Sequence, residues 1–302
     1  MASTAEIKSR IDSMQETRKI TNAMYLIAST KLRKARRDLD QTRPYFDALR
    51  SEIKRIFRTA NDVDSPYFYP TDQEPDLPGT YGCLVITADK GLAGAYNLNV
   101  LKKVQKLLAD HSDMKLFVVG EYGRRFFTQH HIPVERMFLY TAQNPTLDRA
   151  REISSILLEQ YDAGLLKKIF VVYTDMENGM NMRARSTRLL PFHRTYFDTP
   201  EKEKKVAVPF EFQPSVSAVL HGVMHSYLSG FIYSALIDSF CSEQQARMTA
   251  MDSANRNAEE LLADLSLQYN RVRQAAITQE ITEVTAGARA QRKKRRKEVQ
   301  AP

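Results

Sequence analysis

The stretch Asp89–Gly94 (DKGLAG) contains the glycines that a phosphate-binding turn would need. It follows the apolar run Tyr81–Ala88 and precedes a helical pattern that begins near residue 95. A turn between a strand and a helix is a common place for phosphate to bind. The stretch is not G-x-G-x-x-G, however, and it lacks the Lys-Ser or Lys-Thr pair of a P-loop. A structural or contact turn is therefore favoured over a nucleotide site.

Two histidines, His221 and His225, are four residues apart and would share one face of a helix, as two metal ligands can. The HExxH pattern needs a glutamate directly after the first histidine, where this chain has Gly222. The sequence suggests no third ligand nearby, so we expect packed or solvated histidines and no metal site. The neighbours His130 and His131 point to different sides of a helix and are weaker candidates.

No nucleophile has a recognisable setting. The only cysteines, Cys83 and Cys241, lie in no local catalytic signature, and no G-x-S-x-G elbow occurs. Two cysteines also argue against a disulfide scaffold or a cysteine zinc site. The sequence therefore predicts no catalytic residue, no cofactor and no metal.

The net charge of +8 is concentrated in two segments. Residues 18–37 hold seven Lys or Arg and no acid, residues 289–302 hold seven against one glutamate, and the rest of the chain sums to −5. The first segment has three open interpretations: a nucleic-acid stripe, a surface for an acidic protein, or the solvated face of a helix. Tyr25 is its only aromatic residue, which weakens the first interpretation. The second segment is typical of a solvated, self-repelling tail.

Most of these residues lie on two long helical patterns. Between Ile7 and Ile56, twelve of the fifteen positions at alternating steps of four and three are apolar or Ala, which is the period of a coiled coil. Pro44 lies inside this seam, and we expect it to bend the helix without ending it because the seam continues beyond it.

The C-terminal third has the same spacing, with fourteen of eighteen positions apolar or Ala between Val216 and Ala276. Gln244 and Asn255 are polar exceptions that can fix the register. The two seams predict an antiparallel coiled coil of residues 4–58 with 215–270. A second helix that reaches residue 286 would overshoot the first by about 25 Å and leave residues 271–288 without a partner in this chain.

The middle of the chain alternates strand-like and helical stretches. Short apolar runs occur at 81–88, 115–119 and 168–174, with helical stretches at 95–109, 121–130 and 146–163. This alternation predicts βαβ units on a mainly parallel, Rossmann-like sheet. The pair Asn178-Gly179 predicts a hairpin turn into an antiparallel edge strand, Ala184–Pro191. The predicted fold class is thus α/β plus a long antiparallel coiled coil.

The expected division is an N-terminal helix (1–62), a linker rich in Pro, Asp and Tyr (63–80), an α/β domain (81–208), a C-terminal helix (209–288) and a basic tail (289–302). No run of about eighteen apolar residues occurs, so we expect no membrane-spanning segment, and the charged N-terminus predicts no signal peptide. We expect the tail to be disordered or only transiently helical.

The sequence also resembles the gamma subunit of the rotary F-type ATP synthase. The resemblance rests on Ile20–Met24 (ITNAM), Asp89–Gly94 (DKGLAG), Ser242–Met248 (SEQQARM) and Arg273–Glu283 (RQAAITQEITE), and it covers about residues 2–288. Asn22 and Ala93 depart from the usual Lys and Cys of the family.

This resemblance implies a non-catalytic central rotor in which proton flow through a c-ring turns the coiled coil inside a hexamer of alpha and beta subunits, driving ATP synthesis. It implies contacts of Arg273, Gln274 and Thr278 with the hexamer, and it places Met24 and Arg247 at the level of the beta-subunit lever.

The resemblance also implies a foot near Phe210 and Gln213 that faces the c-ring and the epsilon subunit. Gln213 stands where the family has an acidic residue, so a charge-based contact is not expected there. The implied location is peripheral, on the cytoplasmic face of the bacterial cell membrane, with no direct membrane insertion and no nucleic-acid partner. The alternatives are a basic coiled-coil protein that binds nucleic acid and a nucleotide-using α/β enzyme. Salt-dependent DNA binding by the isolated chain would favour the nucleic-acid-binding protein. ATP turnover by the isolated chain would favour the enzyme.

Overall fold

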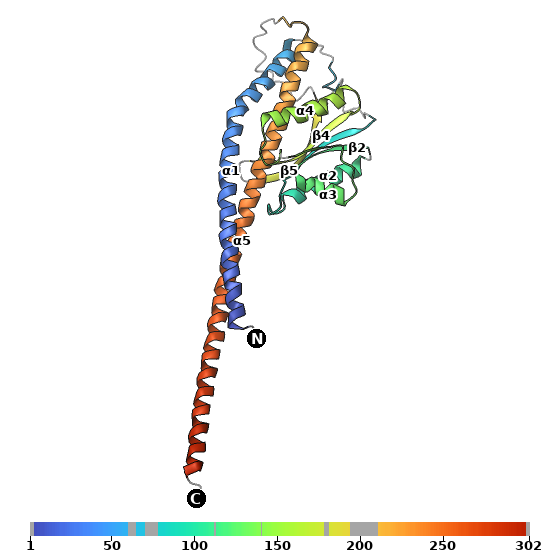
Figure 1. Cartoon of the computed structure of the whole chain (residues 1–302). Coiled ribbons are helices and arrows are strands. Elements are labelled where there is room, and N and C mark those ends of the chain that lie inside the picture. The colour runs from blue at the N-terminus through green and yellow to red at the C-terminus, as the bar shows by residue number, and fades with distance from the viewer. Residues whose placement is uncertain are drawn as a thin grey trace. The chain divides into compact units, whose positions relative to one another are not determined.

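The computed structural model describes residues 3–59, 65–69, 78–111, 113–139, 141–177, 181–193 and 211–299 (Figure 1). Two compact units are present: unit 1 comprises Met1–Leu26 with Met251–Pro302, and unit 2 comprises Ile27–Ala250. The elements in chain order are α1 (Thr4–Thr59), β1 (Tyr81–Ile86), α2 (Tyr96–Asp110), β2 (Met114–Val119), α3 (Glu121–Gln129), β3 (Arg136–Phe138), α4 (Leu147–Asp162), β4 (Lys168–Glu177), β5 (Asn181–Leu190) and α5 (Val216–Val299).

Unit 2 contains a five-stranded sheet in the order β3-β2-β1-β4-β5. The pairs β1·β2, β1·β4 and β2·β3 are parallel, and β5 runs antiparallel to β4. The mainly parallel sheet and its antiparallel edge strand are therefore confirmed. The sequence did not predict β3, because three residues are too few to show a period of two. The predicted turn at Asn178-Gly179 lies outside the described residues.

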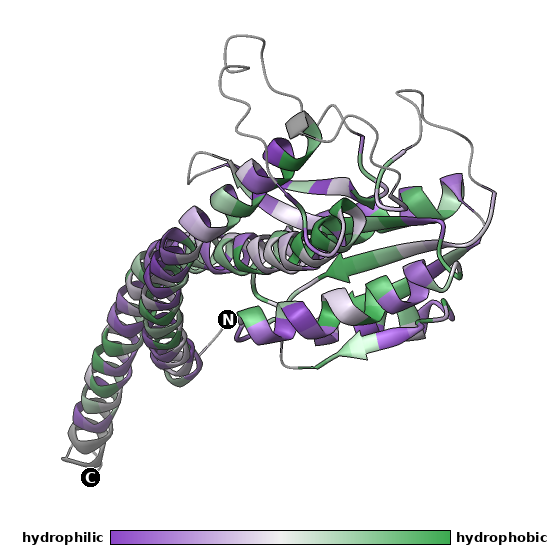
Figure 2. Ribbon diagram, turned by 90° about the horizontal axis from the view of Figure 1, so that it is seen from above, coloured by the Kyte–Doolittle hydropathy of each residue, from purple (hydrophilic) through white to green (hydrophobic). Residues whose placement is uncertain are grey.

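Both faces of the sheet are covered, which explains why β1 is apolar at almost every position. Cys83 and Val85 point to the layer of α2 and α3, where Val100 and Phe127 are fully buried. Alternate β1 residues point to the other face and join a larger core with residues of α4, α5 and α1. Figure 1 shows α4 on the side of the sheet opposite α2 and α3, and Figure 2 shows the middle of the sheet in hydrophobic green.

Within unit 2, α1 and α5 pack against each other at very short range. A Cβ atom on Gly230 would lie 2.0 Å from Cδ1 of Phe46. The Phe46 ring also contacts Tyr233, with centroids 6.3 Å apart. Three residues earlier in α1, Arg43 acts on Asp238, which lies further along α5. The two helices therefore run antiparallel here, and Gly230 is the small residue that lets an aromatic ring from α1 approach the α5 backbone.

Unit 1 repeats the antiparallel pairing with polar contacts. Thr21 donates a hydrogen bond to the side-chain oxygen of Asn255, and Arg18 forms an ion pair with Glu259 at 3.6 Å. Arg18 and Thr21 are two of the three non-apolar seam positions of α1, and each meets a polar residue of α5. Asn255 thus has a partner that only one register provides, as the sequence suggested.

Helix α5 is longer than expected. The sequence predicted an end near residue 286 and a disordered or transiently helical tail, whereas α5 continues to Val299. The prediction for the tail was wrong for a local reason. The segment up to Val299 is made mostly of Ala, Gln, Lys and Arg, which are good helix formers, and cations near a helix C-terminus are favourable. Gly287 alone does not end the helix.

Part of the expected linker is packed instead of solvated. Tyr67, Phe68 and Tyr69 are buried in unit 2, and the Phe68 ring meets Phe57 of α1 edge to face at 4.7 Å. Helix α1 continues through Pro44, as predicted from its seam. Among the described residues, no helix contains a stretch long and apolar enough to cross a membrane.

The approach of Phe46 to Gly230 yields a first prediction. Gly→Ala normally stabilises a helix interior by up to about 1 kcal/mol. We expect Gly230→Ala to lower the free energy of unfolding by about 1–3 kcal/mol, because the new methyl group overpacks against the ring. Thermal unfolding of the full-length chain measures this effect. The matched control is Gly222→Ala in the same helix, where nothing lies within 4 Å, and it should stabilise. If both changes stabilise the chain equally, α1 and α5 are further apart at Gly230 than the structure has them.

Asp238 yields a second prediction. Burial and the carboxylate of Asp175 raise the pKa of Asp238 from 3.8 to about 7, opposed by Arg43 and by a hydrogen bond with Ser234. The folded state therefore binds more protons than the unfolded state between about pH 4 and 7, and stability falls as the pH rises through this range. We expect Asp238→Asn to stabilise the chain by about 1–3 kcal/mol at pH 8 and by little at pH 4. Melting curves at both pH values, with the exposed Asp148→Asn as control, test this, and an equal shift at both would contradict it.

Candidate functional site

The central turn is an exposed loop with an unusual backbone. It joins β1 to α2, and both Leu92 and Gly94 have a left-handed backbone, with φ of 61° and 53°. This conformation is uncommon for a leucine and marks a turn held in place by its surroundings. The Leu92 side chain is 64% exposed. The turn thus presents an apolar side chain to the outside, as expected of a contact turn.

A side chain of the turn caps the neighbouring helix α3. Oδ1 of Asp89 accepts a hydrogen bond of 2.9 Å from the backbone N–H of Glu121, the first residue of α3. A helix N-terminus attracts anions, and here the Asp89 carboxylate supplies the negative charge. The nearby Asn97 side chain accepts from the backbone of Ala88. These two hydrogen bonds tie the segment Ala88–Asp89 to α2 and α3.

Helix α5 holds the turn from the other side. Arg247 donates a hydrogen bond of 3.1 Å to the carbonyl of Gly91 and forms an ion pair of 2.7 Å with Glu243. The side chains of Arg247 and Glu243 are only 11% and 9% exposed. Ala246 of α5 packs against Ala93 and Tyr96, which closes the contact with apolar surface. We call this contact of Gly91, Glu243 and Arg247 the turn joint.

The electrostatics of the turn joint follow from its burial. Burial raises the pKa of the Glu243 carboxyl, and the Arg247 guanidinium opposes this shift. Burial and the Glu243 charge also raise the pKa of Tyr96. A buried ion pair is costly to break, because the partner left behind is an uncompensated charge. The turn joint therefore ties the sheet of unit 2 to one position along α5.

A cavity of about 800 Å³ lies on the outer side of the turn. Its lining mixes apolar side chains such as Phe126 with charges of both signs, including Lys90 and Glu121. Hydrogen bonds from Arg124 and Arg125 lower the pKa of Glu121 to about 2, so this carboxylate stays ionised. The Glu121 charge is balanced by the two arginines that bind it.

The residues that the resemblance assigned to the hexamer lie on exposed helix. Arg273, Gln274 and Thr278 belong to α5 in unit 1, and all three side chains are exposed. Gln274 and Thr278 share a face because they are four residues apart, and the Thr278 hydroxyl donates to the Gln274 carbonyl at 2.9 Å. Met24 of α1 is half-buried, and Arg247 is occupied by the turn joint.

Of the two residues assigned to the foot, only one can be placed. Gln213 is exposed and precedes α5, three residues before its first residue. Phe210 lies outside the described residues.

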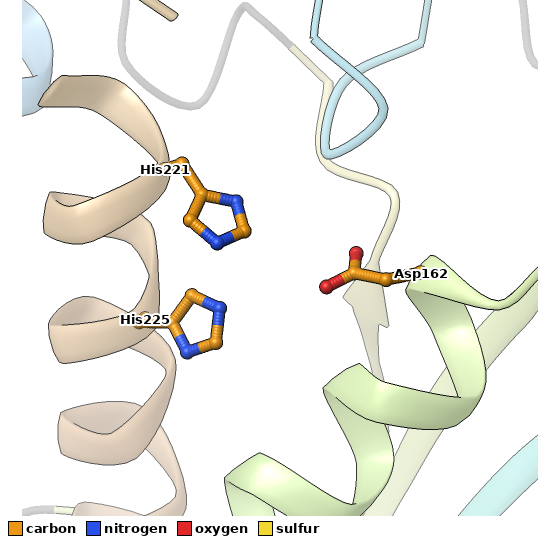
Figure 3. A group of neighbouring side chains, drawn as sticks. All are labelled: Asp162, His221 and His225. Carbon is orange, nitrogen blue, oxygen red and sulfur yellow. The ribbon is translucent and has the colours of Figure 1, made fainter. Parts of the chain in front are cut away.

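The histidine pair has a neighbour that the sequence did not suggest. Asp162, the last residue of α4, lies beside His221 and His225, and one ligand atom from each of the three residues lies within 4.8 Å of the others (Figure 3). The expectation that no third ligand is nearby was wrong. Asp162 is some sixty residues away in the chain and carries no motif, so only the packing of α4 beside α5 could reveal it. The other pair does not form such a group: His130 is bonded to the carbonyl of Phe126.

Comparisons with known proteins agree with the resemblance in the sequence. The sequence model of a family described as ATP synthase matches residues 3–291. The ATP synthase gamma chain of Caldanaerobacter subterraneus subsp. tengcongensis is 43% identical, over 94% of this chain and 98% of the relative. A sodium ion specific ATP synthase gamma chain of Acetobacterium woodii is 36% identical, over 94% and 97%.

Among solved structures, a chain of the Euglena gracilis mitochondrial ATP synthase (OSCP/F1/c-ring, rotational state 3) matches with a TM-score of 0.68, covering 95% of this chain and 94% of that chain. At 16% identity this match supports the fold alone. The family model and the relatives span nearly the whole chain, so the chain belongs to the family of ATP synthase gamma chains.

Proposed function

We propose that this chain is the non-catalytic central rotor of an F-type ATP synthase, and that it transmits torque between an ion-driven c-ring and an alpha/beta hexamer. Membership of the gamma-chain family supports this function. The proposal includes proton coupling. Because the ion binds in the ring, a sodium-driven ring would leave the role of this chain unchanged.

One observation carries the proposal: the last part of α5 has no covering surface from the described part of this chain. From Arg271 to Arg292 every side chain is exposed except Val272, which is partly covered. Ile277, Ile281 and Val284 follow the i, i+4, i+7 spacing of one helix face and are 46%, 61% and 73% exposed. An apolar face of this length favours a partner that surrounds the helix.

The contacts with the hexamer follow from this arrangement. Arg273, Gln274 and Thr278 lie on the exposed part of α5, where a surrounding hexamer could reach them. Met24 and the basic segment 18–37 would meet the acidic lever of the beta subunits. Arg247 would act there indirectly, because its guanidinium fixes the turn that presents Leu92.

The segment just before α5 would contact the ring instead of the hexamer. Gln213 and Phe210 would form the foot toward the c-ring and the epsilon subunit, on the cytoplasmic face of the bacterial cell membrane, with neither membrane insertion nor a nucleic-acid partner. In this division residues 1–62 and 209–288 form the shaft, 63–80 link it to the α/β domain at 81–208, and 289–302 form a basic extension.

The rotor function predicts that the complex depends on the exposed helix. We expect the full-length chain to co-purify with alpha and beta subunits, and a bead attached to its α/β domain to rotate when ATP is added. We expect Arg273→Ala with Gln274→Ala to slow hydrolysis by the assembled complex roughly thirty-fold, because two polar contacts of about 1 kcal/mol each are lost. The matched control is Arg256→Ala, also on α5, whose ion pair is within the helix.

If the double variant rotates and hydrolyses ATP at the wild-type rate, the rotor function holds, but these two residues do not contact the hexamer. Hydrolysis by the alpha and beta subunits while the chain stays still would overturn the rotor function itself.

The non-catalytic role predicts that the isolated full-length chain neither binds nor hydrolyses ATP. The physical reason is that Asp89–Gly94 lacks the Lys-Ser or Lys-Thr pair that places a lysine and a hydroxyl on the phosphates and on magnesium. Calorimetric titration with magnesium and ATP should give no measurable heat of binding. A micromolar affinity that falls on Lys90→Ala would place a nucleotide at the turn and contradict this prediction.

A further inference from the structure

His221 and His225 extend from adjacent turns of α5, and the Asp162 carboxylate reaches toward them from the end of α4 (Figure 3). One ligand atom from each lies within 4.8 Å of the other two. All three residues belong to unit 2, so the grouping is internal to one compact body. Nothing in the rotor function uses these side chains.

The two imidazoles have their nitrogens arranged for ligation. The Tyr67 hydroxyl lies 2.7 Å from Nδ1 of His221, which leaves Nε2 of that ring available. When Nδ1 carries the proton and donates it to Tyr67, Nε2 has a free lone pair, the arrangement in which a second residue orients a metal-binding histidine. Tyr67 itself is buried, so it holds the ring from a fixed position.

The second imidazole has an unused atom. Nε2 of His225 is buried and has no hydrogen-bond partner among the described residues. A buried polar atom without a partner costs free energy and calls for an explanation such as a bound water or ion. The same ring lies beside His221 and Asp162, so an ion placed between the three side chains would give this nitrogen a partner.

The donor set selects the kind of cation. Two imidazole nitrogens and one carboxylate oxygen, with a fourth position open to water, match a tetrahedral zinc site. Calcium and magnesium prefer oxygen ligands only. Ligand atoms around a tetrahedral zinc are roughly 3.4 Å apart, so the largest separation must shrink by about 1.4 Å. Asp162 is exposed at the end of α4, so its side chain can make this adjustment while Tyr67 holds the His221 ring.

We propose that His221, His225 and Asp162 form a binding site for one divalent transition-metal ion, with zinc as the preferred occupant and Tyr67 as the residue that orients His221. The ion links the end of α4 to the start of α5. It would thereby attach the α/β domain to the long helix. The Tyr67–His221 hydrogen bond already exists at the same place. This inference does not depend on the rotor function.

The test uses the full-length chain without a histidine tag, freed of metals by a chelator. Calorimetric titration with zinc chloride should show one ion per chain with micromolar or tighter affinity, and saturating zinc should raise the melting temperature. Cobalt chloride should give the visible absorption of a tetrahedral nitrogen-ligated site. Magnesium chloride should produce neither effect.

Variants connect the binding to the three residues. We expect His221→Gln and His225→Gln each to weaken zinc binding at least 100-fold, and Asp162→Asn at least ten-fold. Controls are the exposed His131→Asn and Asp148→Asn, which should keep the wild-type affinity. Circular dichroism and melting of each metal-free variant show whether it is folded. Absence of zinc binding by the wild-type chain, or unchanged affinity in folded His221→Gln and His225→Gln, would overturn the proposal.

Discussion

The fold of unit 2 depends on burying one segment of α5 from all sides. Between Leu228 and Gln244 all but three side chains are buried. A helix of this kind cannot be stable alone in water, since an apolar surface on every side needs cover on every side. The sheet and α4 supply cover on one side, and α1 supplies it on the other, close enough at Gly230 for a ring to touch the backbone. The remaining elements of unit 2 are arranged around this requirement.

Apolar cover alone would not fix the position of α5 along its own axis, because apolar surfaces tolerate small displacements. Buried hydroxyl groups supply the missing specificity. Ser229 bonds to Ser154 of α4 at 2.7 Å, and Ser239 and Ser242 bond to the backbone of Thr174 in β4. The turn joint adds a charged contact. A displacement of α5 by one turn would leave all of these groups buried without partners, each at a cost of about 1–3 kcal/mol. In the proposed rotor, this is why the α/β domain and the helix turn together.

The sequence was sufficient for features that repeat and insufficient for those that depend on packing. The seams of α1 and α5 extend over many turns, so their type, and a role for Asn255 in the register, could be foreseen; its partner Thr21 could not. The strand β3 and the end of α5 at Val299 could not, since the first is too short and the second has no stop signal. Asp162 beside the histidines required the docking of α4, which no local pattern encodes. The resemblance named Arg247 as a residue of the site, but its bond to Gly91 is a tertiary contact that the sequence did not reveal.

The exposed part of α5 has a property suited to turning within a sleeve. Its threonines bond to their own helix: Thr278, Thr282 and Thr285 donate to carbonyls four residues earlier at 2.7–2.9 Å. These hydroxyls therefore need no partner on another protein. A shaft that relied on hydrogen bonds with its surroundings would have to break them at each step, and every unpaired donor would add to the barrier. Satisfying these donors within the helix keeps the threonine surface compatible with a partner at many rotation angles. The charged and amide side chains of this part of α5, Arg273 and Gln274 among them, are the groups able to distinguish one angle from another.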